Sequence, residues 1–72
     1  MINKPIVIKL IERGIWIFEE IECKYYEDNA GRYWYEFIDG FKLNNKLTGP
    51  YINKNECYKE AFKYYKLEWI PF

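Results

Sequence analysis

The pattern of apolar positions near the start of the chain is compatible with two kinds of element. Apolar residues fall at the i, i+1, i+4 and i+5 positions of a helix face, at Ile6, Val7, Leu10 and Ile11. Asn3 can cap such a helix, and Gly14 can take the left-handed position after its last turn. The pattern therefore favours a helix over residues 5–11. A strand over the same residues stays open as the alternative, because Ile6, Val7 and Ile8 are all β-branched.

The next part of the chain predicts a β-hairpin. One long strand is expected from Ile15 to Glu27, and a second from Arg32 to Ile38. A three-residue loop at positions 29–31, with Gly31 in the left-handed region, joins them. This loop sets the cross-strand pairs, which are Tyr26 with Trp34, Tyr25 with Tyr35, Lys24 with Glu36 and Cys23 with Phe37. A two-residue loop is less favourable, because it would place acidic side chains among the core positions.

This register divides the two strands into an apolar face and a mixed face. The apolar, odd-numbered face is expected to be the core side, with Ile15, Ile17, Ile21, Cys23, Tyr25, Tyr33, Tyr35 and Phe37. The mixed, even-numbered face holds Trp16, Phe18, Glu20, Glu22, Lys24, Tyr26, Arg32, Trp34, Glu36 and Ile38. Glu19 is the one residue that does not fit the odd face, and a β-bulge there would account for it.

The second half of the chain predicts a short strand and a helix. A third strand is expected from Phe41 to Leu43, or as far as Leu47, with Gly49-Pro50 ending it. The clearest helix covers residues 53–69, because Asn53 and Glu56 form a start resembling a capping box. Its apolar stripe consists of Cys57, Tyr58, Ala61, Phe62 and Tyr65. The tail, residues 69–72, is apolar and is expected to fold back on the domain.

Together these elements predict a single α+β domain over residues 1–72. Its three-stranded antiparallel sheet is covered on one face by an N-terminal helix (or strand) and a C-terminal helix. Five Phe, eight Tyr and three Trp are many rings for 72 residues, so some of them are expected on the surface. The uncovered face of the sheet is where Trp16, Phe18, Tyr26 and Trp34 would lie.

Composition excludes several kinds of chemistry. The chain has no histidine, which removes Ser-His and Cys-His nucleophile pairs and most transition-metal sites. Its four glycines form no phosphate-binding loop, and its two cysteines have no metal-site spacing. We therefore expect no catalytic residues, no metal and no cofactor. No apolar run is long enough to span a membrane, and the start does not resemble a signal peptide, so the expected location is the cytoplasm.

The charge is zero overall but unevenly distributed. Residues 12–39 carry eight acidic and three basic side chains, whereas residues 40–72 carry six lysines and three glutamates. An aromatic surface bordered by acids is typical of a site for a larger protein, and the acids suit a partner with a basic surface. The predicted partner-binding residues are Trp16, Phe18, Glu20, Glu22, Tyr26, Trp34 and Glu36. On this hypothesis Trp34→Ala weakens binding by roughly 2 kcal/mol and leaves the fold intact.

Three other interpretations stay open. The open face could join two copies into a homodimer, or its rings could serve only as stabilising cross-strand pairs. Nucleic-acid binding is the third. It would use the lysines of the last helix, which are Lys54, Lys59, Lys63 and Lys66. The order helix, three strands, helix resembles the double-stranded RNA-binding domain in topology, and that family holds phosphates with a lysine cluster where this chain has "NKNECYK". The zero net charge and acidic sheet count against it. Cys23 and Cys57 are expected to be buried, reduced thiols, and the sequence leaves open whether they are close together or bonded.

The chain also resembles short proteins of phages and other mobile elements. The resemblance lies in a "Leu-Ile-x-x-Gly" segment, a strand meander and a "Gly-Pro-aromatic" turn before a final helix with a "Glu-x-x-x-x-Ala" pattern. The matching residues are Leu10, Ile11, Gly14, Gly49, Pro50, Tyr51, Glu56 and Ala61. The resemblance implies a stoichiometric binder that inhibits or adapts a host defence or regulatory protein, located in the host cytoplasm. It implies no catalytic residues.

Overall fold

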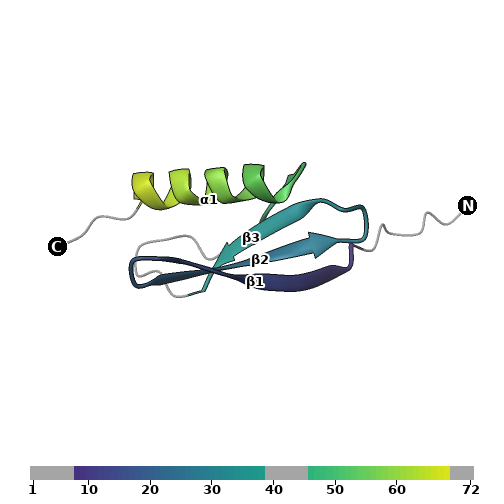
Figure 1. Ribbon diagram of the computed structural model, residues 1–72, viewed down its shortest axis with the longest axis horizontal. Helices are drawn as coiled ribbons and strands as arrows, with labels where there is room; N and C mark the ends of the chain where they lie inside the picture. The colour runs from purple at the N-terminus through teal and green to yellow at the C-terminus, as the bar shows by residue number, and fades with distance from the viewer. Residues whose placement is uncertain (1–7, 39–45, 69–72) are drawn as a thin grey trace, which may run out of the picture.

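The described part of the chain folds into a four-stranded antiparallel sheet with one helix on one face (Figure 1). The computed structural model describes residues 8–38 and 46–68. The elements in chain order are β1 (Leu10–Phe18), β2 (Ile21–Asp28), β3 (Tyr33–Phe37), β4 (Thr48–Tyr51) and α1 (Lys54–Glu68). The strands lie in the sheet in the same order as in the chain. The α+β class and the C-terminal helix are thus as predicted, but the described sheet has four strands instead of three.

The first difference from the sequence prediction is a tight turn at Glu19 and Glu20. The predicted single strand from Ile15 to Glu27 is wrong, because the chain reverses there and Phe18 pairs with Ile21. Glu19 takes a left-handed conformation with φ of 58°. That conformation costs energy for a residue with a side chain, so turns of this kind usually contain glycine or asparagine. Two consecutive glutamates therefore did not indicate a turn. The misfit at Glu19 is therefore this turn and not a bulge.

The turn reverses the assignment of β1 side chains to the two faces of the sheet. Trp16 pairs with Cys23, so the even-numbered residues of β1 from Gly14 to Phe18 share a face with odd-numbered residues of β2. Trp16 and Phe18 therefore lie on the helix side, and Phe18 is only 5% exposed. Ile15 and Ile17, predicted as core, lie on the open face with 45% and 65% of their surface exposed.

The hairpin between β2 and β3 has the predicted register, with Lys24 opposite Glu36 and Tyr26 opposite Trp34. Asp28 organises the loop that joins the two strands. Its Oδ1 accepts hydrogen bonds from the backbone N–H groups of Ala30 (2.8 Å) and Arg32 (2.9 Å). Its Oδ2 accepts one from Trp34 Nε1 at 2.8 Å. The Trp34 bond and the Arg32 backbone bond are the main reasons that the pKa of Asp28 lies below its usual value.

The beginning of the described chain is extended. The helix expected over residues 5–11 is wrong at its C-terminal end, because Leu10 and Ile11 belong to β1. Residues 8 and 9 belong to no helix or strand, and residues 5–7 lie outside the described residues. β1 then carries a register irregularity between Glu12 and Gly14, beyond which the strand continues to Phe18.

The fourth strand contains the residues that were expected to end a strand. Gly49 and Pro50 lie inside β4, and the peptide bond between them is cis. A Cβ atom on Gly49 would lie 2.8 Å from Cδ2 of Trp34 and 2.9 Å from the carbonyl oxygen of Tyr33. Glycine is therefore required there, because it lets the Trp34 ring lie against the backbone of β4. The strand expected over residues 41–43 lies outside the described residues.

Helix α1 begins as the sequence predicts. The Oδ1 atom of Asn53 accepts a hydrogen bond from the backbone N–H of Glu56 at 2.8 Å. Cys57, Ala61 and Tyr65 of the predicted stripe are buried, but Tyr58 and Phe62 are 43% and 40% exposed. The apolar tail, residues 69–72, lies outside the described part of the chain.

The core lies between α1 and the sheet. Its largest fully buried side chains are Phe37, Cys23 and Cys57. The helix packs mainly against β3 and β4 and makes fewer contacts with the other two strands. The half of the sheet formed by β1 and β2 is filled by aromatic side chains instead, and these form the surface described next.

Candidate binding surface

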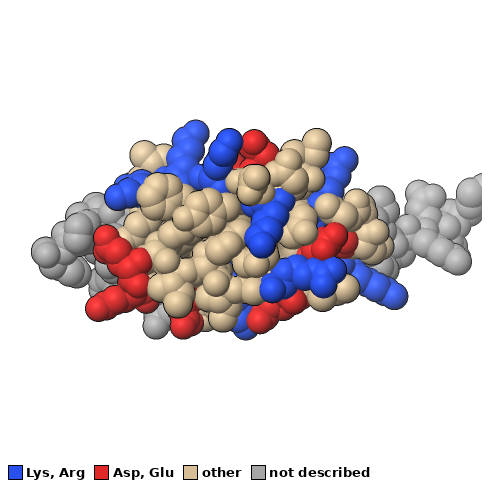
Figure 2. Space-filling model, in the orientation of Figure 1, with Lys and Arg blue, Asp and Glu red and all other residues tan. Residues whose placement is uncertain are grey.

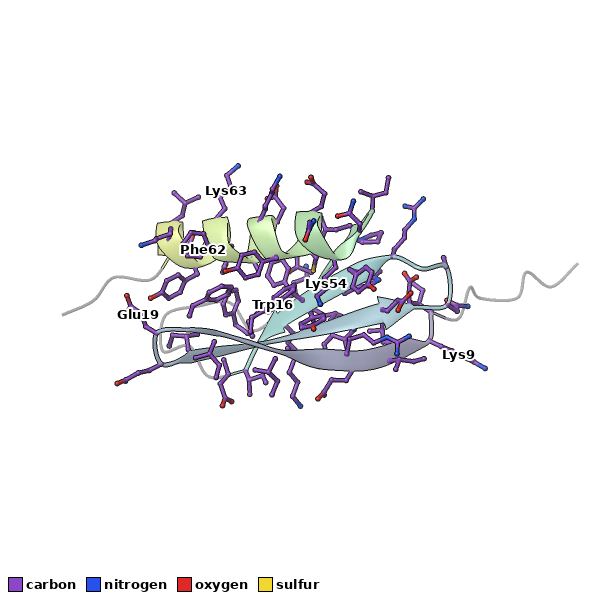
Figure 3. The ribbon with its side chains drawn as sticks, in the orientation of Figure 1. Lys9, Trp16, Glu19, Lys54, Phe62 and Lys63 are labelled. Carbon is purple, nitrogen blue, oxygen red and sulfur yellow. The ribbon has the colours of Figure 1, made fainter. Side chains whose placement is uncertain are left out.

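Four aromatic rings lie side by side between α1 and the β1 side of the sheet, and we call them the aromatic patch: Trp16, Tyr25, Tyr58 and Phe62 (Figure 3). Trp16 and Tyr25 stack with their ring centres 4.2 Å apart and an angle of 13° between the planes. Tyr58 meets Trp16 edge-on at 5.1 Å. Phe62 is parallel to Tyr58 at 6.3 Å. Such contacts hold each ring in one orientation.

Phe18 forms the floor of the aromatic patch. Its ring contacts those of Tyr58 and Phe62 at 5.7 and 5.6 Å, and it stacks on Tyr65 at 5.4 Å. Because Phe18 is buried, it supports the exposed rings and does not itself face a partner. The sequence placed Phe18 on the exposed face of the sheet, whereas the structure buries it on the helix side.

Gly14 makes room for the innermost ring of the patch. A Cβ atom at this position would lie 2.8 Å from the Tyr25 hydroxyl and 3.0 Å from two of its ring carbons. The absence of a side chain lets Tyr25 lie across β1 beside Trp16. On its other side, the Lys54 ammonium lies 5.3 Å from the centre of the Tyr25 ring.

Lysines border the aromatic patch along α1. Lys66 lies 5.6 Å from the centre of the Phe62 ring, near the other end of the helix from Lys54. Figure 2 shows the uncharged surface in the middle of this view, with mainly basic side chains above it along α1. Acidic side chains lie along the lower, sheet side of the view, where a second group of basic side chains lies at the lower right. The helix border of the patch is thus basic, whereas the sequence placed an acidic border around the rings.

The residues predicted to form one partner surface are divided between two faces. Trp16 and Phe18 lie on the helix side, whereas Glu22, Tyr26, Trp34 and Glu36 remain on the open face. Glu20 lies in the turn. The predicted residues therefore do not form one continuous surface. The turn at Glu19 and Glu20 places Trp16 and Phe18 on the opposite face of the sheet from the others.

On the open face the two predicted rings serve the sheet itself. Tyr26 donates a hydrogen bond to Glu36 Oε1 at 2.9 Å. Burial first, and then this bond, raise the pKa of Tyr26 to about 12. Trp34 is partly buried against Gly49 and bonded to Asp28. Neither ring therefore offers a free polar group to a partner.

The lysines of the alternative nucleic-acid surface do not act as one cluster. Lys54 and Lys66 lie over aromatic rings, and Lys59 is 3.9 Å from Glu56. Lys63 points away from the sheet (Figure 3).

Tyr58 and Phe62 were missed as surface residues because a helix stripe of five apolar residues is normally buried. Their exposure was indicated by the width of the apolar stripe. A helix near the edge of a narrow sheet cannot bury all five of these side chains.

Both cysteines are free and fully buried. Burial raises the pKa of the Cys23 thiol to about 12, and the nearby Cys57 contributes to this increase. Burial also raises the pKa of the Cys57 thiol to about 12.

Within residues 8–38 and 46–68, no three acidic or cysteine side chains group as they would around a metal ion. Among the same residues, no helix has the length and apolar character needed to cross a membrane.

Comparison with known proteins found no match to this chain among protein families, curated proteins or solved structures.

Proposed function

We propose that this protein is a non-catalytic binding module that holds a partner protein on the aromatic patch. The observation that carries the proposal is the exposure of Tyr58 and Phe62, at 43% and 40%, on top of an ordered stack of rings. An exposed group of large apolar side chains on a small domain is typical of an interaction site.

The physical advantage of this surface is its preorganisation. Trp16 is stacked on Tyr25, and Phe18 supports Tyr58 from below. Rings held in this way lose little rotamer freedom on binding, so most of the area they bury contributes to affinity. Tyrosine and tryptophan are the residues most often found as energetic centres of protein interfaces.

The border of the patch indicates the chemistry of the partner. Lys54 and Lys66 are already positioned over the rings of Tyr25 and Phe62. A partner segment with one apolar anchor flanked by carboxylates would fill the patch and pair with these lysines. We therefore propose an acidic partner surface in place of the basic one suggested by the sequence. A stoichiometric role as an inhibitor or adaptor, which the resemblance to phage proteins implies, is consistent with this kind of binding.

The test is site-specific photo-crosslinking. A benzophenone amino acid in place of Phe62 puts the reactive group on the patch and keeps an aromatic ring there. The matched control has the same group in place of Lys63, which lies next in the chain and points away from the sheet (Figure 3). We expect a defined protein adduct from position 62 that is lost on Tyr58→Ala, and none from position 63.

Two results would overturn the proposal. Equal crosslinking from positions 62 and 63 would show that the patch is not the binding surface. Adducts that disappear on nuclease treatment, together with a steep loss of binding as salt rises, would assign the surface to nucleic acid, with stacked bases in place of protein side chains.

A further inference from the structure

The sheet has one edge that carries no charged side chain over five consecutive residues. β1 forms this edge, and its segment from Gly14 to Phe18 reads Gly-Ile-Trp-Ile-Phe. Among the described strands only β2 pairs with β1, so the outer backbone groups of this segment are open there. Ile15 and Ile17 are also 45% and 65% exposed. An apolar edge of this kind is a template for another strand.

The opposite edge of the sheet is protected in three ways that β1 lacks. β4 is only four residues long, and Pro50 removes one of its backbone donors. Helix α1 also packs against β4. Natural sheets use such features to prevent pairing between edges. Their presence at β4 and absence at Gly14–Phe18 distinguish the two edges, and only β1 is suited to accept a strand.

We propose that a second copy of this chain pairs with β1 in antiparallel orientation, with Trp16 opposite Trp16 of the second copy. In this register Ile15 lies opposite Ile17 of the second copy, and Gly14 lies opposite its Phe18. Each pair then joins residues of the same face, because Gly14, Trp16 and Phe18 are on the helix side and both isoleucines are on the open side. The two exposed isoleucines of each copy become buried against each other.

The charges that flank the apolar segment support the same register. Arg13 precedes Gly14 and Glu19 follows Phe18, so each Arg13 falls beside Glu19 of the other copy. Arg13 is exposed at the edge, where it already pairs with Glu27 at 2.9 Å. Glu19 lies at the turn end of β1 (Figure 3). The apolar segment is thus complementary to itself only when the strands are antiparallel. The irregularity at Glu12–Gly14 and the turn at Glu19 limit the pairing to this segment.

This inference does not depend on the proposed function, and its test is the mass of the protein in solution. Sedimentation at several concentrations should show a dimer for the wild type and a monomer for Ile17→Lys, because the lysine would be buried opposite Ile15. The matched control is Ile52→Lys, which makes the same change at a residue that is 77% exposed and lies between β4 and α1. It should remain dimeric.

A charge exchange tests the register itself. Arg13→Glu and Glu19→Arg should each weaken the dimer, because each places like charges at both flanks. A mixture of the two variants should restore it as a heterodimer, since both flanks are then oppositely charged. Restoration cannot come from a variant that has merely unfolded. Tyr58→Ala should leave the dimer intact, and Ile17→Lys should leave crosslinking at position 62 intact.

The inference would be overturned by a wild-type chain that is monomeric at every concentration, which would mean that β1 is covered within one chain or faces water. It would also be overturned by a dimer that Ile17→Lys does not affect, which would place the contact elsewhere. Failure of the heterodimer to form from the mixed charge variants would overturn the register.

Discussion

Replacing Trp34 by alanine should destabilise the fold, because the ring lies against Gly49 and its indole N–H is bonded to Asp28. Truncation of a fully buried tryptophan costs about 3–5 kcal/mol. Trp34 is only partly buried, so we expect about 2 kcal/mol. A domain of this size has only ~3–5 kcal/mol of net stability. The melting temperature should therefore fall by roughly 10 °C.

The measurement is thermal and urea unfolding followed by far-ultraviolet circular dichroism. Tyr58→Ala is the matched control, because it removes a large ring that is 43% exposed and should change the midpoint much less. The sequence alone had predicted that Trp34→Ala spares the fold. If the variant melts within about 2 °C of the wild type, that first prediction is correct and the structural role assigned to Trp34 is wrong.

A double-mutant cycle with Gly49 isolates the contact. Gly49→Ala alone should destabilise by about 1–3 kcal/mol, because the added methyl group would collide with the Trp34 ring. In the Trp34→Ala background the ring is gone, and part of that cost should disappear. Equal costs of Gly49→Ala in both backgrounds would show that the two residues are not coupled, and that the clash with the Tyr33 carbonyl accounts for the whole effect.

Two further predictions concern the glycine under the aromatic patch and the carboxylate of the hairpin loop. Gly14→Ala should push Tyr25 off Trp16, cost about 1 kcal/mol and reduce the near-ultraviolet dichroism of the stacked pair, so an unchanged aromatic spectrum would contradict the contact. The pKa of Asp28 is lowered on folding, so its contribution to stability is present above the ordinary pKa of about 3.8 and is lost as the pH falls through the lower folded value. The melting temperatures of the wild type and Asp28→Asn should therefore begin to converge below about pH 4 and meet below the folded pKa, and a difference that persists below that pKa would refute this.

The hairpin of β2 and β3 could be predicted because its loop has strong local signals. Gly31 has the φ of 79° that the predicted loop requires, and Asp28 accepts hydrogen bonds from the loop backbone. The turn between β1 and β2 could not be predicted, because its left-handed residue is Glu19 and not glycine or asparagine. Packing decides that turn, since it places Trp16 and Phe18 against α1. The error was small in sequence but moved the β1 side chains from Ile15 to Phe18 to the other face.

The sequence predicted an exposed aromatic surface but not most of the residues that form the aromatic patch. An aromatic surface was expected from the number of rings, and Trp16 belongs to it. Tyr58 and Phe62 could not be assigned from helix periodicity alone, because periodicity defines a face but not how much of that face the sheet covers. The coverage depends on where α1 crosses the sheet, and it lies over β3 and β4.

The position of β1 between the two proposed interfaces has a consequence for binding strength. In the antiparallel pairing proposed here, the two-fold axis is perpendicular to the sheet, so both helices lie on the same side of a continuous sheet. Both aromatic patches would then face the same direction, on either side of the paired Trp16 residues. A partner with two acidic, apolar segments, or a partner that is itself a dimer, could occupy both patches at once and gain avidity without any new contact. Ile17→Lys would remove this gain and leave binding to a single patch unchanged, so the two interfaces can be separated by measuring affinity for monovalent and bivalent forms of the same partner.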